Sequence, residues 1–91
     1  MDLDLRDRTV IVTGGGRGIG RVMCTTFAKE GANVVAADIL PDDARLGPDE
    51  TTTEQECMDL GVRSSYIHTD VTQLDQVMKM RDEVMATYGQ I

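Results

Sequence analysis

Hydrophobic positions along this chain fall into short continuous runs separated by longer stretches with helical spacing. Three of the short runs are rich in β-branched residues and predict strands over Thr9–Thr13, Asn33–Asp38 and residues 62–69. The third run has less apolar content than the other two because two serines interrupt it. The first two runs are apolar at successive positions, which is typical of strands covered on both faces in a parallel sheet.

A first helix is predicted between the first two strands. Ile19, Met23 and Phe27 recur four residues apart, with Val22 beside them, and indicate one apolar helix face. Gly31 is suited to end this helix, because glycine readily adopts the left-handed conformation that follows many helices.

Two further helices are predicted in the second half of the chain. One is expected over residues 52–60, before Gly61. The other is expected to begin at Thr72 as its N-cap and to end at Gly89. Its apolar stripe consists of Leu74, Val77, Val84 and Tyr88. Residues 40–51 are polar and contain both prolines of the chain, so we expect an exposed loop there.

This alternation of strand and helix predicts the α/β fold class, with parallel strands joined by right-handed helical crossovers. The chain has 91 residues, a length that fits one small domain or a piece of a larger one. Its net charge of −7 argues against a nucleic-acid partner, because phosphate backbones require clustered Lys and Arg.

No apolar run approaches the roughly 20 residues that cross a bilayer, and the acidic N-terminus does not resemble a signal peptide. We therefore expect a cytoplasmic protein without a membrane partner. Cys24 and Cys57 make neither a disulfide framework nor a metal site of the usual spacing, and we expect buried, idle thiols. No metal is predicted. His68 is expected to have a structural role.

The glycine-rich turn after the first strand is the feature that carries chemistry. Glycines at 14, 15, 16, 18 and 20 allow a ligand to approach the backbone, and the first amides of the following helix can bind a pyrophosphate. The general dinucleotide pattern G-x-G-x-x-G is not met, but Asp38 lies 18 residues after Gly20. That offset is close to the roughly 20 residues at which an acid binds the ribose hydroxyls of NAD.

With these residues in place, the segment Thr13–Gly20 resembles the Thr-Gly-x-x-x-Gly-x-Gly cofactor signature of the short-chain dehydrogenases/reductases. Asp38 matches the acid after their second strand, Asp70-Val71 matches the pair after the third, and residues 89–91 match the segment before the fourth. The resemblance covers nearly the whole chain. It implies a partial, doubly wound Rossmann-type sheet of strand order 3-2-1, truncated before the fourth strand, with residues 1–91 as the N-terminal part of one NAD(P)-binding domain.

The resemblance also implies a set of cofactor-binding residues. The turn would hold the diphosphate, Ile19 would approach the nicotinamide, Asp38 would bind the ribose, and Asp70 and Val71 would contact the adenine. The full set is Gly14, Gly16, Arg17, Gly18, Ile19, Gly20, Asp38, Asp70 and Val71. NAD is expected rather than NADP, because a carboxylate at position 38 would repel the 2′-phosphate, although Arg17 is a residue that often accompanies NADP in the family.

Family members transfer a hydride between nicotinamide and an alcohol or carbonyl substrate, using a Tyr-x-x-x-Lys pair with a serine and an asparagine. Neither Tyr66 nor Tyr88 has a lysine four residues later, so no catalytic residue is predicted and the 91 residues alone are expected to be inactive. We expect the N-terminal portion of a longer, homo-oligomeric enzyme. A stand-alone nucleotide-binding or regulatory module is the alternative, and an inactive remnant is a third, weaker one.

Some of these residues also have plainer interpretations. The glycine turn could be a structural corner, and Asp38 a solvated acid of a turn. Asp70 could serve as a cap or loop residue at the start of the last helix. Arg17 could simply face solvent.

Overall fold

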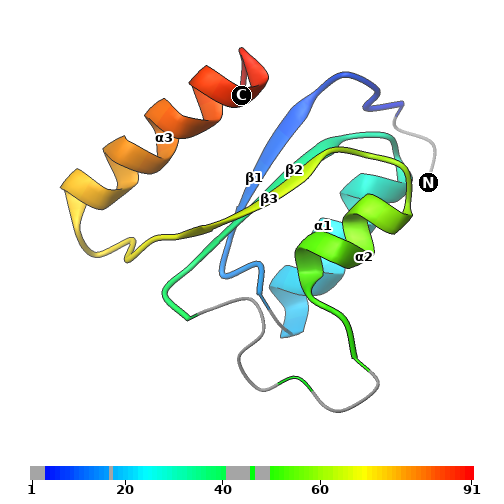
Figure 1. Ribbon diagram of the computed structural model, residues 1–91, viewed down its shortest axis with the longest axis horizontal. Helices are drawn as coiled ribbons and strands as arrows, with labels where there is room; N and C mark the ends of the chain where they lie inside the picture. The colour runs from blue at the N-terminus through cyan, green and yellow to red at the C-terminus, as the bar shows by residue number, and fades with distance from the viewer. Residues whose placement is uncertain (1–3, 17, 41–45, 47–49) are drawn as a thin grey trace.

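The computed structural model describes residues 4–16, 18–40, 46 and 50–91, and in it strands and helices alternate along the chain (Figure 1). The strands are β1 (Thr9–Thr13), β2 (Asn33–Asp38) and β3 (Ser64–His68). The helices are α1 (Gly18–Lys29), α2 (Thr53–Asp59) and α3 (Leu74–Tyr88). The predicted β-α-β-α-β-α order is confirmed.

The three strands form one parallel sheet in the order β1-β2-β3. Val12 pairs with Ala36 between β1 and β2, and Asp38 pairs with His68 between β2 and β3. Four consecutive residues of the central strand, Val34 to Ala37, are buried, as expected for a strand covered on both faces. The predicted strand order 3-2-1 is therefore confirmed, and all carboxyl ends lie at one edge.

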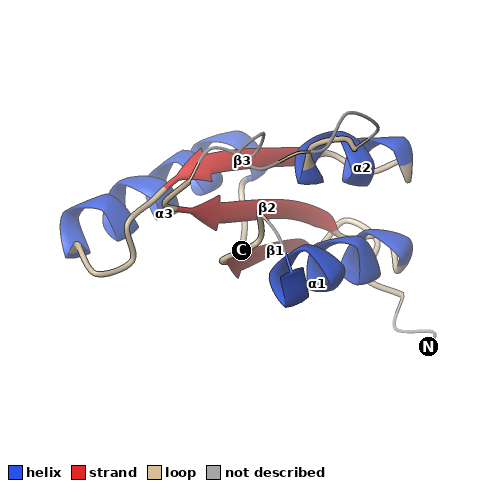
Figure 2. Cartoon of the chain, turned by 90° about the horizontal axis from the view of Figure 1, so that it is seen from below, coloured by secondary structure: helices blue, strands red, loops and turns tan. Residues whose placement is uncertain are grey.

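Helices cover the two faces of this sheet in separate layers (Figure 2). Helices α1 and α2 share one face, over a core formed by Val12, Cys24, Ala28, Val34, Ala36 and Cys57. Helix α3 packs on the opposite face, over a core formed by Val35, Ala37, Met80 and Val84. Successive residues of β2 thus serve opposite layers, as the two-residue repeat of a strand requires.

The buried face of α1 differs from the apolar face that the sequence predicts. Cys24 and Ala28 are buried against the sheet, whereas Ile19, Val22 and Met23 are 82%, 63% and 44% exposed. These side chains line an open apolar groove of about 530 Å³ with Phe27. The prediction located the hydrophobic stripe of α1, but the close contact with the sheet is made by small residues.

The observed ends of the later helices and strand differ in part from the predicted ends. Helix α2 has Thr52 as its N-cap, whose hydroxyl accepts a hydrogen bond from the Gln55 amide at 3.1 Å. The N-cap of α3 is Gln73, so the prediction of Thr72 was wrong. Strand β3 is shorter than the predicted 62–69. Most of the predicted loop 40–51 lies outside the described residues.

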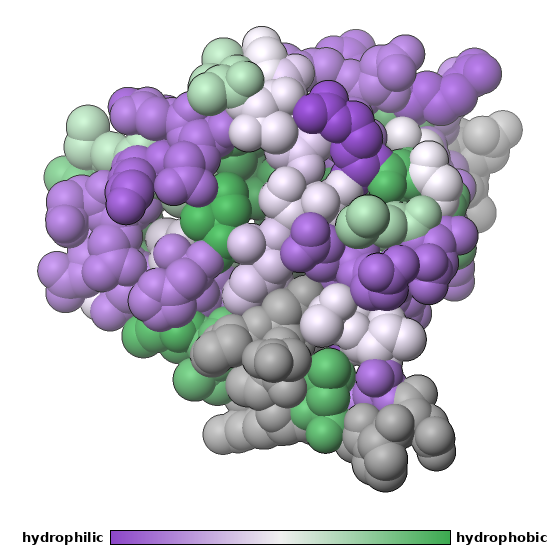
Figure 3. All heavy atoms as spheres, viewed as in Figure 1, coloured by the Kyte–Doolittle hydropathy of each residue, from purple (hydrophilic) through white to green (hydrophobic). Residues whose placement is uncertain are grey.

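Helix α3 has one apolar side and one strongly polar side. Val84 and Met80 are buried, while Leu74, at the first turn, is 72% exposed and lies outside the core. Hydrophilic side chains dominate the outer surface over α3 (Figure 3). Within the described ranges, every helix is too short or too polar to cross a bilayer.

Candidate functional site: the turn between β1 and α1

The glycine turn leaves β1 at the carboxyl edge of the sheet and presents open backbone. Gly14 and Gly18 have positive φ angles of 70° and 59°, which favour glycine. A Cβ atom at either position would meet nothing within 4 Å. The Gly14 amide donates to the Ala37 carbonyl at 2.7 Å, which ties the turn to the end of β2.

The inner side of the same turn is packed without spare room. A Cβ atom at Gly20 would lie 2.0 Å from the carbonyl oxygen of Gly14, and one at Gly15 would lie 2.9 Å from the Cys24 sulfur. Gly20 therefore lets α1 begin directly against the turn, which is the packing role of the last glycine in dinucleotide-binding turns. The turn is closed toward the core and open toward solvent.

Asp38 lies beside the turn, as the spacing predicts. The amide of Gly16 donates to Oδ2 of Asp38 at 3.3 Å, and the amide of Ile39 donates to Oδ1 at 2.7 Å. A carboxylate has about four lone-pair sites, so two amide donors leave capacity for further hydrogen bonds. Asp38 is half-buried and can accept bonds from a vicinal diol on its exposed side.

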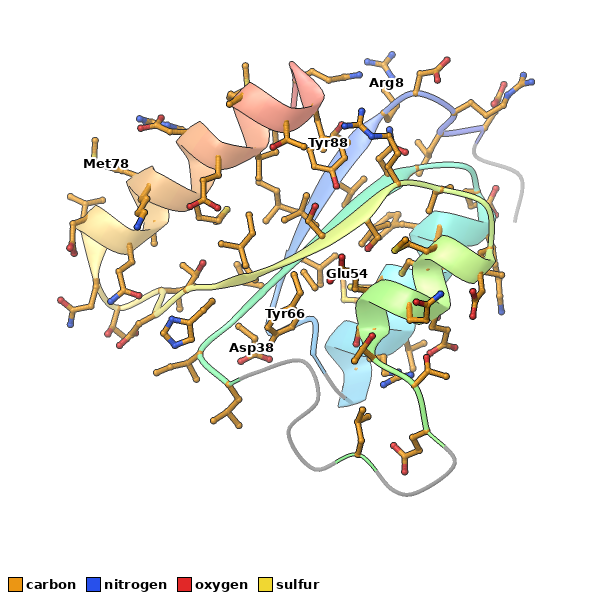
Figure 4. All side chains as sticks on the ribbon, viewed as in Figure 1. Arg8, Asp38, Glu54, Tyr66, Met78 and Tyr88 are labelled. Atoms are coloured by element: carbon orange, nitrogen blue, oxygen red, sulfur yellow. The ribbon has the colours of Figure 1, made fainter. Side chains whose placement is uncertain are left out.

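Two side chains that the sequence analysis did not connect with the turn also meet Gly16. The Thr53 hydroxyl donates to the Gly16 carbonyl at 3.2 Å. The Tyr66 ring lies next to Asp38 (Figure 4), and its hydroxyl would be 3.0 Å from a Cβ atom at Gly16. The same hydroxyl donates to the Leu40 carbonyl. No local pattern signals these contacts, because they join positions far apart in the sequence.

Asp70 and Val71 follow β3 at the same edge of the sheet. The Thr69 amide donates to the Asp38 carbonyl at 2.8 Å, so the hydrogen bonds between β2 and β3 continue up to the residue before Asp70. The Asp70 carboxylate accepts from the hydroxyl and the amide of Thr72, at 2.6 and 3.0 Å. These bonds lower the pKa of Asp70. Asp70 thus stabilises the turn before α3, and Val71 is 56% exposed.

The open side of the turn fits a dinucleotide. Backbone without Cβ atoms at Gly14 and Gly18 leaves room for a diphosphate at the N-terminus of α1, where the helix dipole is positive. Ile19 is exposed beside this surface. The carboxylate of Asp38 lies beside the turn at Gly16 and is available to a ribose. Arg17 lies outside the described residues.

The remaining candidate residues do not form a second reactive site. Cys24 and Cys57 are both buried, as predicted, and no disulfide joins them. His68 is exposed at the end of β3. Within the part of the chain that the structure describes, no three His, Cys, Asp or Glu side chains are grouped to hold a metal ion.

Comparison with known proteins places this turn in a family context. Residues 8–91 match the family model of the short chain dehydrogenases. Tropinone reductase-like 2 of Erythroxylum coca is 38% identical over 96% of this chain and 28% of its own length. The chain spans about 30% of the length of the curated relatives that it matches.

Solved structures show the same arrangement. A short-chain type dehydrogenase/reductase from Mycobacterium marinum has a TM-score of 0.83 and 31% identity, over 97% of this chain and 33% of its own. A short chain dehydrogenase from Mycobacterium paratuberculosis, bound to NAD, has a TM-score of 0.79 and 27% identity, over 97% and 35%. With its parallel sheet, its glycine turn and the family match over residues 8–91, this chain belongs to the short chain dehydrogenase family.

Proposed function

We propose that this chain is the NAD-binding portion of an oxidoreductase that transfers hydride between a nicotinamide cofactor and an alcohol or carbonyl substrate. The observation that carries the proposal is the 3.3 Å hydrogen bond between the Gly16 amide and Asp38 Oδ2. It joins the phosphate-binding turn to a carboxylate able to bind a ribose. The dehydrogenase relatives favour an enzyme over the stand-alone module considered as the alternative.

Each part of the dinucleotide has a binding surface in this proposal. The backbone at Gly14, Gly16, Gly18 and Gly20 holds the diphosphate, and Ile19 approaches the nicotinamide end. Asp38 accepts hydrogen bonds from the 2′- and 3′-hydroxyls of the adenosine ribose. Asp70 and Val71, at the end of β3, contact the adenine. Arg17 stays a predicted binding residue of the turn.

The preference for NAD follows from the charge of Asp38. A carboxylate accepts hydrogen bonds from a diol but repels a 2′-phosphate held against it, because like charges at close range disfavour binding. Both oxygens of Asp38 already accept hydrogen bonds from backbone amides, which holds the carboxylate beside the glycine turn. The Mycobacterium paratuberculosis relative bound to NAD supports the same cofactor.

The chemistry requires residues that these 91 positions do not contain. Nicotinamide supplies or accepts the hydride, while a tyrosine with a nearby lysine moves the proton in the family that this chain resembles. The Tyr66 hydroxyl donates a hydrogen bond to the Leu40 carbonyl, and the Tyr88 hydroxyl is hydrogen-bonded to the Ser65 hydroxyl. Both tyrosines of this segment therefore make structural hydrogen bonds. We assign this segment to cofactor binding and no residue of it to catalysis. A cytoplasmic location and a homo-oligomeric full-length form remain predictions.

Titration calorimetry with NAD and NADP tests the proposal. We expect the full chain to bind NAD more tightly than NADP. We expect Asp38→Ala to lose at least about tenfold in NAD affinity, because hydrogen bonds to a charged group contribute about 1.5–3 kcal/mol. The variant should also discriminate less against NADP. Asp82→Ala is the matched control, since it removes the same charge from an exposed position of α3.

Two results would contradict the proposal. An unmodified protein that binds neither dinucleotide would remove the cofactor function. Unchanged selectivity in Asp38→Ala would remove Asp38 from the ribose site.

A further inference from the structure

Three elements meet at Gly16. Its amide donates to Asp38 at the end of β2, and its carbonyl accepts from Thr53 at the start of α2. The Tyr66 hydroxyl of β3 lies close beside Gly16, 3.0 Å from where a Cβ atom would be. Gly16 is therefore held on both sides of its Cα atom, and its position depends on α2 as well as on the sheet.

Thr53 makes this contact from inside the protein. Its side chain is fully buried, so it is out of reach of a ligand that binds on the open side of the turn. One turn later, Glu56 of α2 pairs with Arg21 of α1, with a closest N–O distance of 2.6 Å. Two side chains of α2 thus connect this helix with the turn and with the helix that follows it.

The contact of Thr53 has a consequence for Asp38. The Gly16 carbonyl is part-buried, so without the Thr53 donor it can shift toward solvent to find another. A shift of Gly16 would take its amide away from Asp38 Oδ2, which lies at the outer range of a hydrogen bond, 3.3 Å. The carboxylate would then keep only the Ile39 amide on Oδ1 and be free to turn.

We propose that Thr53 is a positioning residue for cofactor selectivity, acting through Gly16 on the orientation of the Asp38 carboxylate. This inference rests on the proposed NAD-binding function. It makes α2 contribute to cofactor selectivity through Thr53, whose side chain is buried.

The experiment compares three variants of the full chain. Thr53→Val removes the hydroxyl and keeps the shape, and Thr53→Ser keeps the hydroxyl. Thr9→Val is the matched control, because the Thr9 hydroxyl is also buried but has no partner among the described residues. For each protein, dissociation constants for NAD and NADP are measured by calorimetry, and thermal unfolding is recorded alongside.

We expect the ratio of the NADP to the NAD dissociation constant to fall about tenfold in Thr53→Val, equivalent to about 1.4 kcal/mol. Thr53→Ser and Thr9→Val should keep the ratio of the unmodified protein. A general loss of stability would weaken the binding of NAD and NADP alike and leave the ratio unchanged. The ratio therefore distinguishes a positioning role of Thr53 from a role in folding alone.

An unchanged ratio in Thr53→Val, with NAD still bound, would overturn the inference and leave the proposed function intact. If Thr53→Val does not fold, Thr53→Ala replaces it under the same criterion. Failure of both variants to fold, with Thr53→Ser unaffected, would assign the hydroxyl to stability and also overturn the inference. Absence of NAD binding in the unmodified protein would instead contradict the proposed function.

Discussion

Gly20 has the least room of the glycines in the turn. A Cβ atom there would lie 2.0 Å from the Gly14 carbonyl oxygen, which is backbone and cannot rotate away. We predict that Gly20→Ala lowers the free energy of unfolding by about 3 kcal/mol or more, because overpacking must displace the start of α1. Chemical denaturation measures this change.

Gly61 provides the control for that prediction. Its φ angle of 94° also favours glycine, but a Cβ atom would meet nothing within 4 Å. Gly61→Ala should therefore cost only about 1–2 kcal/mol, the price of the left-handed conformation. Equal losses in the two variants would show that close packing at Gly20 has no special weight.

Asp70 gives a prediction that depends on pH. Hydrogen bonds from the Thr72 hydroxyl, and then from its amide, lower the pKa of Asp70. Because the folded pKa lies below the unfolded one, the contact stabilises the protein above about pH 4. Its contribution is lost as the pH falls through the folded pKa. Thr72→Val should raise the pKa of Asp70 in an NMR titration, whereas Thr72→Ser should keep it low; an equal pKa in both would contradict the assignment.

The sequence predicts the role of Asp38 in the site, but it does not predict the contact that Thr53 makes. The offset from Gly20 and the end of an apolar run both indicate Asp38, because strand length fixes where the chain returns to the carboxyl edge of the sheet. The contact of Thr53 with Gly16 spans 37 positions and includes a loop mostly outside the described residues. The packing of α2 against α1 and against the sheet brings these two residues together.

The starts of α2 and α3 differ in a way that can be measured. The Thr52 hydroxyl caps α2 by accepting from the Gln55 amide, while Gln73 makes no side-chain hydrogen bond at the start of α3. Thr52→Ala should cost about 1 kcal/mol in the free energy of unfolding, and Gln73→Ser should add about 0.5–1 kcal/mol. Urea denaturation checks both; a stability loss in Gln73→Ser would show that its backbone does not suit a capping side chain.

Helix α1 shows where the hydrophobic pattern misleads. Its large apolar residues predict the buried face, but Cys24 and Ala28 are the residues that contact the sheet. Small side chains let a helix approach a sheet closely, and Gly15 of the turn leaves room for Cys24 in the same way. Of the large residues in the pattern, Phe27 packs against the core, whereas Ile19, Val22 and Met23 remain exposed.

Over the whole molecule, both outer strands have a free edge in the described part of the chain, since β2 alone lies between two neighbours. The alternation of elements predicted parallel strands joined by helical crossovers, whereas the order of the strands was predicted only from the family resemblance. The exposed groove on α1 was not predicted, because the pattern does not show which side of a helix faces the sheet. The described parts of the candidate site lie at the carboxyl edge of this sheet.

Nuclear magnetic resonance of ¹⁵N-glycine-labelled protein shows whether NAD binds at the glycine turn, because it observes the turn amides themselves. On addition of NAD, we expect the largest amide shifts at the turn positions Gly14, Gly16, Gly18 and Gly20. Gly31, Gly61 and Gly89 follow helix ends elsewhere in the fold and should not move. Binding of NAD that leaves the turn amides unchanged, or that shifts the three distant glycines equally, would contradict the account.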